Sequence, residues 1–308
     1  MSAPSIAARL VQRISWEEIN PEALRSLISL ARGEDLNGHG LATPPRFGGD
    51  LTSRFLRDDP RRASAALTAR QPLVACGLQL VPMILAAYGE ETEFTPACED
   101  GDTCPAGAVL GKISGPAHVL LEAERVILNF LQHLSGIATL TGLYVRALGQ
   151  SGTRLLDTRK TTPGFRVLEK YAVACGGGFN HRMGLFDRIM LKDNHLAAAG
   201  VRAGSALADL VRRAQSASPD RVVQLEVDSL DQIPPALEAG IEVFLLDNFT
   251  PAQLREALAL VGNRAATEAS GGITLEGLPA LASLGLDFIS TGATVHQATW
   301  TDIGLDWL

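Results

Sequence analysis

Hydrophobic and polar positions follow two different patterns along the chain, and the pattern changes near residue 150. Residues 16–32 show the spacing of an amphipathic helix, with Pro21 early in its course. Residues 33–50 are rich in Gly, Pro and Asn and predict an exposed loop. Residues 119–148 then repeat apolar side chains at helical spacing, which predicts a long helix that bends or breaks at Ser135 and Gly136.

Short apolar runs alternate with helical segments in the second half of the chain. The runs occupy residues 153–156, 188–191, 222–227, 243–246, 265–268 and 286–290. Strands that alternate with helices imply parallel βαβ units. About six such units fall short of a complete eightfold barrel. The first hundred residues mix helices with short alternating strands and predict an α+β layer instead.

Composition sets broad limits on the protein class. The chain has 308 residues, 46% hydrophobic and 20% charged, which is enough for a large core. The opening ten residues contain no apolar signal segment, and the longest apolar run, near residues 80–88, is too short to span a bilayer. We therefore expect a cytoplasmic protein without a membrane partner. The four cysteines lack the spacing of a zinc site, and we interpret them as reduced thiols.

Positive charge is concentrated in residues 157–195. This segment carries seven Lys or Arg and four Asp or Glu, a net charge of +3, within a chain of net charge −7. The rest of the chain must therefore carry −10. Cations gathered around glycine-rich turns in an acidic protein favour a small, highly charged anionic ligand. Nucleic acid is a poor alternative, because the chain has no extended basic face and few aromatic residues.

Several motifs in this region carry a family resemblance. In order they read DTRKTTPG, GGGFNHRMGL, LKDNH, LEVDS, LLDNF, EASGG and TGA, after an upstream LLEAERVILNFLQHLSGIAT. They resemble the type II phosphoribosyltransferases, and specifically the quinolinate phosphoribosyltransferase family. The resemblance implies transfer of a phosphoribosyl group from 5-phosphoribosyl 1-pyrophosphate to quinolinate, with decarboxylation. The products would be nicotinate mononucleotide, CO2 and pyrophosphate, for de novo NAD biosynthesis.

The resemblance also implies a fold: an incomplete α/β barrel of about six parallel strands preceded by an α+β sandwich domain. We place the sandwich at residues 1–134, joined by residues 287–308, and the barrel at residues 135–286. Departures from the family pattern lie near the amino end, where residues 37–48 insert NGHGLATPPRFG before a Gly-Asp-Leu-Thr motif. These departures bear on the sandwich and leave the chemistry untouched.

Quinolinate carries two adjacent carboxylates, so its pocket needs several cations. The family pattern assigns this role to residues at three predicted strand ends, and Lys160 beside them is a catalytic candidate. The alternative for any one of these side chains is a surface ion pair, and Lys192 could also form a Schiff base in a desolvated site. For residues 176–178 we favour a flexible turn that lets His181 and Arg182 reach the substrate, and direct phosphate binding is the alternative. The quinolinate-binding candidates are Thr158, Arg159, His181, Arg182 and Lys192.

Two acidic residues and two glycine-containing turns complete the predicted site. Glu226 and Asp247 end strands, and the resemblance assigns them to Mg²⁺ and to catalysis, since Mg²⁺ binds through few carboxylates together with substrate phosphates. Helix capping or pairing with nearby cations is the alternative. Turns after two late strands predict a site for the 5-phosphate. They comprise Ser270, Gly271 and Gly272, then Thr291, Gly292 and Ala293. No organic cofactor is expected.

Arg125 lies on the long predicted helix, away from every strand end. The family contributes this arginine to the quinolinate site of a neighbouring subunit, which implies a homodimer with shared active sites. Pairing with Glu122 on the same helix is the alternative. Three other functions remain open: a nicotinate transferase with fewer carboxylate clamps, a related protein of molybdenum transport that departs from DTRKTTPG and NHR, and a non-enzymatic anion-binding module.

Overall fold

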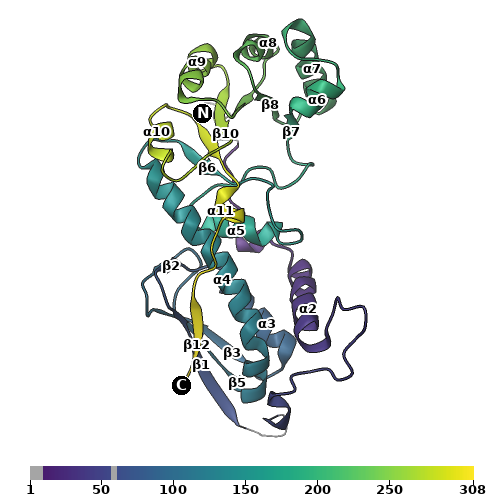
Figure 1. The fold of residues 1–308 in the computed structure, drawn as a ribbon, viewed down its shortest axis with the longest axis vertical. Coiled ribbons are helices and arrows are strands. Elements are labelled where there is room, and N and C mark those ends of the chain that lie inside the picture. Colours follow the sequence, from purple (N-terminus) through teal and green to yellow (C-terminus); the bar gives the residue numbers. More distant parts are fainter. Residues whose placement is uncertain (1–9, 57–60) are drawn as a thin grey trace. The chain divides into compact units, whose positions relative to one another are not determined.

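The structure is a computed structural model that describes residues 10–56 and 61–308. The first nine residues, which hold nearly all of the segment examined for a signal sequence, lie outside the described residues. The described chain divides into two compact units (Figure 1). The barrel unit contains the residues up to Arg13, Leu143–Thr162 and Gly178–Gln297. The sandwich unit contains Ile14–Gly142, Pro163–Gly177 and Ala298–Leu308.

The barrel unit is built on a parallel sheet of six strands, in the order β6-β11-β10-β9-β8-β7. All six apolar runs of the sequence form these strands, so this prediction is confirmed. The strands are β6 (Arg154–Leu156), β7 (Ile189–Leu191), β8 (Val223–Val227), β9 (Val243–Asp247), β10 (Ala266–Ser270) and β11 (Phe288–Ser290). The helices are α6 (Asp193–Ala198), α7 (Gly204–Ala217), η3 (Leu230–Gln232), α8 (Ile233–Glu238), α9 (Pro251–Val261), α10 (Leu278–Ala282) and α11 (Ala293–His296).

Local sequence explains this alternation of strands and helices. Phe244 and Phe288 are fully buried apolar side chains on the sheet, and such continuously apolar strands are typical of parallel sheets covered on both faces. Thr250 caps α9 by accepting a hydrogen bond from the Gln253 N–H group, and Pro251 fits the first helical position because it needs no hydrogen-bond acceptor. Parallel strands bring all six carboxyl ends to one edge of the sheet, where a site is expected.

The sandwich unit contains an antiparallel sheet of four strands in the order β12-β1-β5-β3. The last strand of the chain, β12, therefore returns to the sandwich unit, as the family resemblance implies. The strands of this unit are β1 (Arg62–Ala69), β2 (Leu73–Val74), β3 (Glu93–Pro96), β4 (Thr103–Cys104), β5 (Val109–Pro116) and β12 (Ile303–Trp307). The helices are η1 (Trp16–Glu18), α2 (Pro21–Asn37), η2 (Ser53–Leu56), α3 (Leu80–Tyr88) and α5 (Arg166–Cys175), and α4 (Ala117–Leu148) runs from this unit into the barrel unit.

Two helix predictions need correction. The helix expected over residues 16–32 begins at Pro21, because Asn20 caps it and Pro21 takes its first position, and it extends to Asn37. The long helix α4 continues through Ser135 and Gly136 without a break. A Cβ atom at Gly136 would lie 2.3 Å from the Thr299 carbonyl oxygen, so this glycine permits close backbone packing.

The two compact units differ from the predicted boundaries. Strand β11 belongs to the parallel sheet, so the return to the sandwich begins at Ala298 instead of residue 287. Residues 163–177, which include α5, pack with the sandwich unit although they lie between barrel strands in sequence. Helix α4 is long and apolar enough to cross a membrane by composition alone, but 67% of its apolar window is buried, as in a core helix.

Candidate active site

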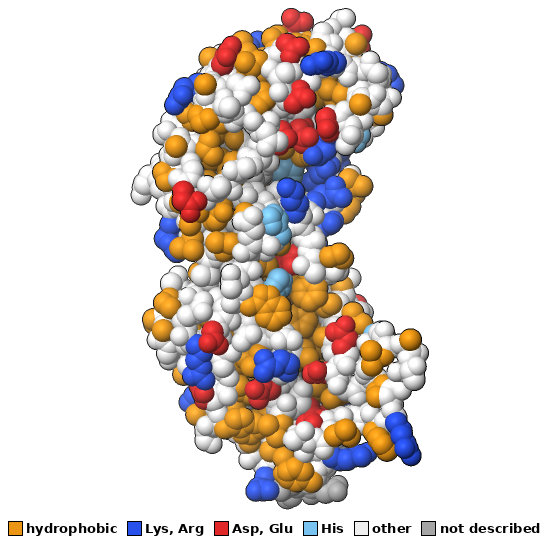
Figure 2. All heavy atoms as spheres, viewed as in Figure 1, with side chains coloured by type: hydrophobic (Ala, Val, Ile, Leu, Met, Phe, Trp, Pro, Cys, Tyr) orange, Lys and Arg blue, Asp and Glu red, His pale blue; other side chains and the backbone are white. Residues whose placement is uncertain are grey.

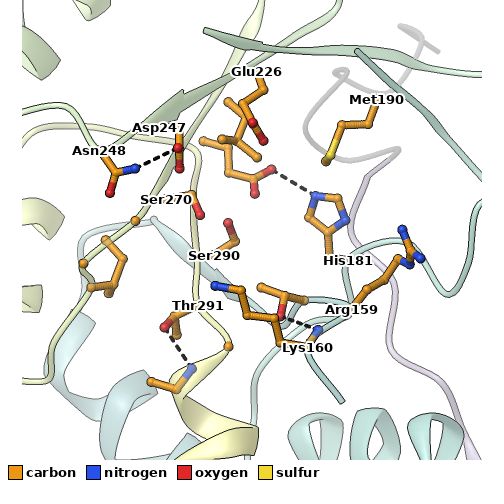
Figure 3. Close-up of a pocket in the computed structure, with 18 of the residues that line it drawn as sticks. Arg159, Lys160, His181, Met190, Glu226, Asp247, Asn248, Ser270, Ser290 and Thr291 are labelled. Carbon is orange, nitrogen blue, oxygen red and sulfur yellow. Dashed lines mark hydrogen bonds and ion pairs between the residues drawn. The ribbon is translucent and has the colours of Figure 1, made fainter. Parts of the chain in front are cut away.

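A cavity of about 750 Å³ lies at the carboxyl ends of the parallel strands, within the barrel unit. On the face shown in Figure 2, Lys and Arg side chains gather next to Asp and Glu side chains in this unit. In Figure 3, Lys160 and Thr291 lie on one side of the cavity, and Glu226 and Asp247 on another. The sequence-predicted residues that line the cavity are Thr158, Arg159, Lys160, His181, Arg182, Lys192, Glu226, Asp247, Ser270, Gly271, Gly272, Thr291, Gly292 and Ala293.

Asp157 ties together the two segments that supply most of the cations. This fully buried carboxylate follows β6 directly. Its Oδ1 atom accepts a hydrogen bond from the His181 N–H group at 2.8 Å, and its Oδ2 atom accepts one from Asn180 Nδ2 at 2.8 Å. The segment after β6 and the segment around His181 are therefore fixed relative to each other. Asp157 belongs to the motif DTRKTTPG, but the sequence alone predicts no role for it.

The triple glycine before His181 is packed more tightly than predicted. A Cβ atom at Gly176 would lie 2.4 Å from the Ala138 carbonyl oxygen and 2.6 Å from Thr141 Cβ. Gly177 has a φ of 86°, a conformation that side chains disfavour. The prediction of a flexible turn is therefore corrected: close packing and left-handed backbone explain the first two glycines.

Positive charges lie close together on the cationic side of the cavity. Burial lowers the pKa of the Arg182 guanidinium from its ordinary value, and the nearby charge of Arg159 lowers it further. Arg182 stays protonated at neutral pH because an arginine pKa is so high. Functional sites often bring like charges close together, and a ligand of opposite charge then relieves their repulsion. This side of the cavity therefore favours an anionic ligand.

The opposite side of the cavity holds two carboxylates with different partners. Lys192 Nζ donates a hydrogen bond to Glu226 Oε2 at 2.6 Å, and their side chains are 39% and 13% exposed. Asp247 Oδ2 accepts a hydrogen bond from Asn248 Nδ2 at 2.8 Å (Figure 3). Lys192 and Glu226 have separate predicted roles, whereas they form an ion pair in the structure. Lys192 thus links the cationic side of the cavity to the acidic side.

Two glycine-containing turns lie side by side because β10 and β11 are neighbours in the sheet. Gly271 has a φ of 88°, and a Cβ atom there would lie 2.2 Å from Asn248 Oδ1. A Cβ atom at Gly292 would lie 2.9 Å from Lys160 Cδ and 3.0 Å from His296 Cδ2. Gly292 therefore leaves the space in which the Lys160 side chain lies.

Several cavity residues were not predicted from the sequence. Each of four lies two positions before a predicted site residue at the end of a strand, and alternate residues of a strand face the same side. This alternation along the strands is the sequence signal from which the four residues could have been predicted. A fifth, His296, follows the last turn on the short helix α11. These residues are Met190, Leu245, Glu268 and Ser290, with His296.

Glu268 is part of a chain of polar side chains beneath the cavity. Gln224 Nε2 donates a hydrogen bond to Glu268 Oε2 at 2.7 Å, and His181 Nε2 lies 3.4 Å from the same oxygen. Arg188 Nη1 donates to Gln224 Oε1 at 3.3 Å. Arg188, Gln224, Glu268 and His181 are each at most 8% exposed, and we call them the buried network.

Arg125 is exposed on α4 in the sandwich unit and is not one of the described residues that line this cavity. Among the described residues, no group of three or more His, Cys, Asp or Glu side chains is arranged to hold a metal ion. Glu226 and Asp247 would then hold a metal ion as two carboxylate groups, with the remaining ligands drawn from water or substrate.

Comparison with known proteins matches this chain to one family. The family profile described as quinolinate phosphoribosyl transferase, C-terminal domain, matches residues 137–306, and the profile for the N-terminal domain matches residues 50–135. A Bacillus subtilis protein named a probable nicotinate-nucleotide pyrophosphorylase (carboxylating) is 40% identical over 84% of this chain and 88% of its own length.

Two further relatives match over nearly their full length. The nicotinate-nucleotide pyrophosphorylase (carboxylating) of Mycobacterium leprae is 37% identical over 92% of this chain and 97% of its own. The solved structure of the nicotinate-nucleotide pyrophosphorylase from Francisella tularensis superposes with a TM-score of 0.86 at 33% identity, covering 96% of this chain and 100% of that one. The two profile matches and these full-length similarities show that the chain belongs to the quinolinate phosphoribosyltransferase family.

Proposed function

We propose that this protein transfers the phosphoribosyl group of 5-phosphoribosyl 1-pyrophosphate to quinolinate and releases CO2 and pyrophosphate. The product is nicotinate mononucleotide, a precursor for NAD biosynthesis. One observation carries the proposal: a single cavity joins a cationic side to two carboxylates and two glycine-containing turns, all at the carboxyl ends of parallel strands. These parts correspond to the dianionic acceptor, the ribosyl centre and the phosphates of the donor.

Quinolinate is assigned to the cationic side. Arg159 and Arg182 offer planar guanidinium groups that match carboxylates, and Lys192, His181 and Thr158 line the same wall. The mutual repulsion of Arg159 and Arg182 supports this assignment, because a dianion would relieve it. Two carboxylates on adjacent ring atoms can engage more of these cations than the single carboxylate of nicotinate.

The 5-phosphate of the donor is assigned to the paired turns of β10 and β11. Ser270, Gly271 and Gly272 meet Thr291 and Gly292 there. Backbone N–H groups in such turns can cradle a phosphate without a bulky side chain in the way. Gly272 supports this assignment, because a Cβ atom at this position would meet open space.

Magnesium is assigned to Glu226 and Asp247. Two carboxylates with water and substrate phosphates suit Mg²⁺, which seldom uses an all-protein cage, and the absence of a larger cluster of ligating side chains in the described residues fits this mode. The Lys192–Glu226 ion pair is partly exposed, so Glu226 can exchange its partner. The ion would neutralise charge on the pyrophosphate.

The chain's own residues can assist each stage of the reaction. Cleavage of the bond between the anomeric carbon and pyrophosphate builds positive charge on the ribosyl group, which Glu226 and Asp247 can stabilise. Lys160 stabilises the negative charge that accumulates on the leaving pyrophosphate. The quinolinate nitrogen then forms the new bond to the anomeric carbon. The alkylated ring holds the electron pair left by departing CO2, and a proton replaces the lost carboxylate. No covalent bond to the protein is required, so positioning supplies much of the catalysis.

A homodimer with shared active sites is the proposed assembly. Arg125 supports it, because this exposed cation lies in the sandwich unit and outside the set of described residues that line the barrel cavity. In a closed twofold dimer, each Arg125 would enter the site of the other subunit in the same way. The partner arginine would add a further cation for quinolinate.

Incubation of the protein with quinolinate, 5-phosphoribosyl 1-pyrophosphate and Mg²⁺ tests the proposed reaction. CO2 and pyrophosphate should form in equal amounts, and omission of either substrate should abolish both products. Formation of pyrophosphate without CO2, or turnover that does not need quinolinate, would contradict the proposal.

A further inference from the structure

Glu268 is a buried carboxylate that the proposed reaction leaves without a role. It lies on the central strand β10, is fully buried and still lines the cavity floor. Thr267, the preceding residue, turns to the other side of the strand and bonds to Asp287 instead. A carboxylate held beneath a pocket for a dianion would repel that ligand unless neighbouring groups balance its charge. Its presence there therefore calls for another role.

The surroundings of Glu268 keep it ionised. Burial would raise the pKa of this carboxyl group, but the neighbouring His181 ring and hydrogen bonds from Ser290 and Gln224 outweigh burial and lower the pKa to about 2. Arg188 is the buried counter-charge, and Gln224 lies between the two. The Gln224 amide accepts from Arg188 and donates to Glu268, so the donors of the buried network all point toward Glu268.

His181 is held on both ring nitrogens. The Arg182 N–H group donates to His181 Nδ1 at 2.7 Å, so Nδ1 carries a lone pair and a proton on the ring sits on Nε2. Nε2 faces Glu268 Oε2, and the His181 N–H group is held by Asp157. A flip of the ring would break the contacts of both nitrogens. Because Arg182 donates its own N–H group to this ring, the ring also steadies the backbone that carries the Arg182 guanidinium.

We propose that Glu268 is a positioning residue for quinolinate recognition, which acts through His181 to fix the imidazole ring and the Arg182 backbone before the substrate arrives. The proposal rests on the proposed function, since it assigns His181 and Arg182 to quinolinate. It also explains why an anion is tolerated beneath an anion pocket. Arg188 balances its charge and its Oε2 atom faces the N–H group of His181, so the substrate meets the cations that these contacts hold in place.

The substitution Glu268→Gln tests this role because it keeps the shape and removes the charge. The amide oxygen can take the place of Oε2, the oxygen that both Gln224 and His181 contact, so the variant weakens the hold on the His181 ring by removing the negative charge. The KM for quinolinate should rise roughly 10- to 100-fold, the usual cost of losing a residue that orients a ligand-binding group. The KM for 5-phosphoribosyl 1-pyrophosphate should change less than twofold. An equal rise in both KM values would overturn the proposal.

Thr267→Val is the matched control. It removes a buried hydrogen bond from the same strand on the side away from the cavity. Both KM values should stay at the wild-type level in this variant, even where its melting temperature falls. A quinolinate KM that rises as much as in Glu268→Gln would mean that any damage to β10 has this effect, and the specific role of Glu268 would be wrong.

A double-mutant cycle with His181→Ala separates positioning from direct contact. If Glu268 acts through His181, adding Glu268→Gln to His181→Ala should change quinolinate affinity less than twofold further, a strongly non-additive result. Full additivity would show that Glu268 acts by another route, and the proposal would be wrong. Quinolinate binding is measured by calorimetry in the absence of the second substrate, so the result does not depend on turnover. Failure of wild type to bind quinolinate would instead overturn the proposed function.

Nitrogen-15 NMR of histidine-labelled wild-type protein gives a readout that needs no variant of Glu268 to fold. The His181 signals, assigned by their loss in His181→Ala, should show a protonated Nε2 and an unprotonated Nδ1 at neutral pH. A proton on Nδ1 would contradict the arrangement from which the role of Glu268 is inferred.

Discussion

The floor and the rim of the same cavity hold their charges in different ways. On the floor, the buried network of Arg188, Gln224, Glu268 and His181 is at most 8% exposed and is connected by contacts already present without substrate. On the rim, the Lys192–Glu226 ion pair is partly exposed and lies where substrate and metal would bind. Charged groups on the floor are held by buried partners. Charges on the rim can change partners at little cost.

This difference assigns different tasks to the two regions. A low-dielectric floor makes hydrogen bonds strong and their loss costly, so it suits the positioning of the cations that meet quinolinate. A partly solvated rim suits groups that must neutralise charge as it develops on the ribosyl centre and on pyrophosphate. Substitutions on the rim should therefore reduce turnover, whereas substitutions on the floor should weaken quinolinate binding.

The largest effect is expected on the rim, from Glu226→Gln combined with Asp247→Asn. Turnover should fall by about 10³-fold or more, since loss of one group that stabilises transition-state charge costs about 10²- to 10³-fold. Stimulation by Mg²⁺ should disappear, while quinolinate affinity measured by calorimetry should largely survive because the cationic wall is intact. A collapse of quinolinate affinity with normal metal dependence would show that these roles are wrong.

Arg125→Ala and Lys160→Ala test whether the rim is completed by a second subunit. Each variant should fold and dimerise but be nearly inactive. After dissociation and mixing, random pairing gives about half mixed dimers, each with one intact site, so activity should recover to roughly a quarter of wild type. No recovery despite demonstrated subunit exchange would place Arg125 in its own subunit's site or in a structural role.

A smaller effect is expected from Gly292→Ala, which crowds the rim without removing a charge. The new Cβ atom would lie 2.9 Å from Lys160 Cδ and 3.0 Å from His296 Cδ2. Both neighbours are side chains that can move, so the melting temperature should change by only a few degrees. Displacement of Lys160 should lower kcat by about tenfold, since small misplacements of catalytic groups are costly. Unchanged kcat in steady-state assays would show that the position of Lys160 is not critical.

The smallest effect is expected on the stability of the folded protein in acid, from Glu268 on the floor of the cavity. Because the folded-state pKa of Glu268 is about 2, below its ordinary value of 4.5, Glu268 stabilises the folded protein above about pH 4.5. That contribution is lost as the pH falls from 4.5 toward 2. The free energy of unfolding, measured by urea denaturation, should therefore fall less between pH 6 and pH 3 in Glu268→Gln than in wild type. An equal fall in the two proteins would contradict the lowered pKa.

Local pattern predicted the strands and the rim well, and missed features that depend on packing between distant segments. Six apolar runs were enough to predict β6 to β11, because most residues of these buried parallel strands are apolar. The prediction of a helix break at Gly136 was wrong, because the sequence could not show that the Thr299 carbonyl packs against this glycine. Asp157 also received no role, because its bonds to Asn180 and His181 join residues more than twenty positions apart.

The residues on the floor of the cavity could have been predicted in part from the sequence. Glu268 lies two positions before Ser270 and Gln224 two before Glu226, so strand alternation places them on the same side as predicted site residues. A polar residue in an otherwise apolar strand is the signal. What no spacing could show is that Gln224 and Glu268, on strands separated by β9, would bond to each other.

Quinolinate labelled with carbon-13 in its 2-carboxylate, with nicotinate as the competing acid, tests the central claim most directly. The account predicts that the labelled carbon appears as CO2 in a one-to-one ratio with pyrophosphate, only when 5-phosphoribosyl 1-pyrophosphate is present. Nicotinate should be turned over at least 10²-fold less efficiently, because it would leave cations of the pocket without a partner. Comparable turnover of both acids, or retention of the label in the nucleotide product, would contradict the account.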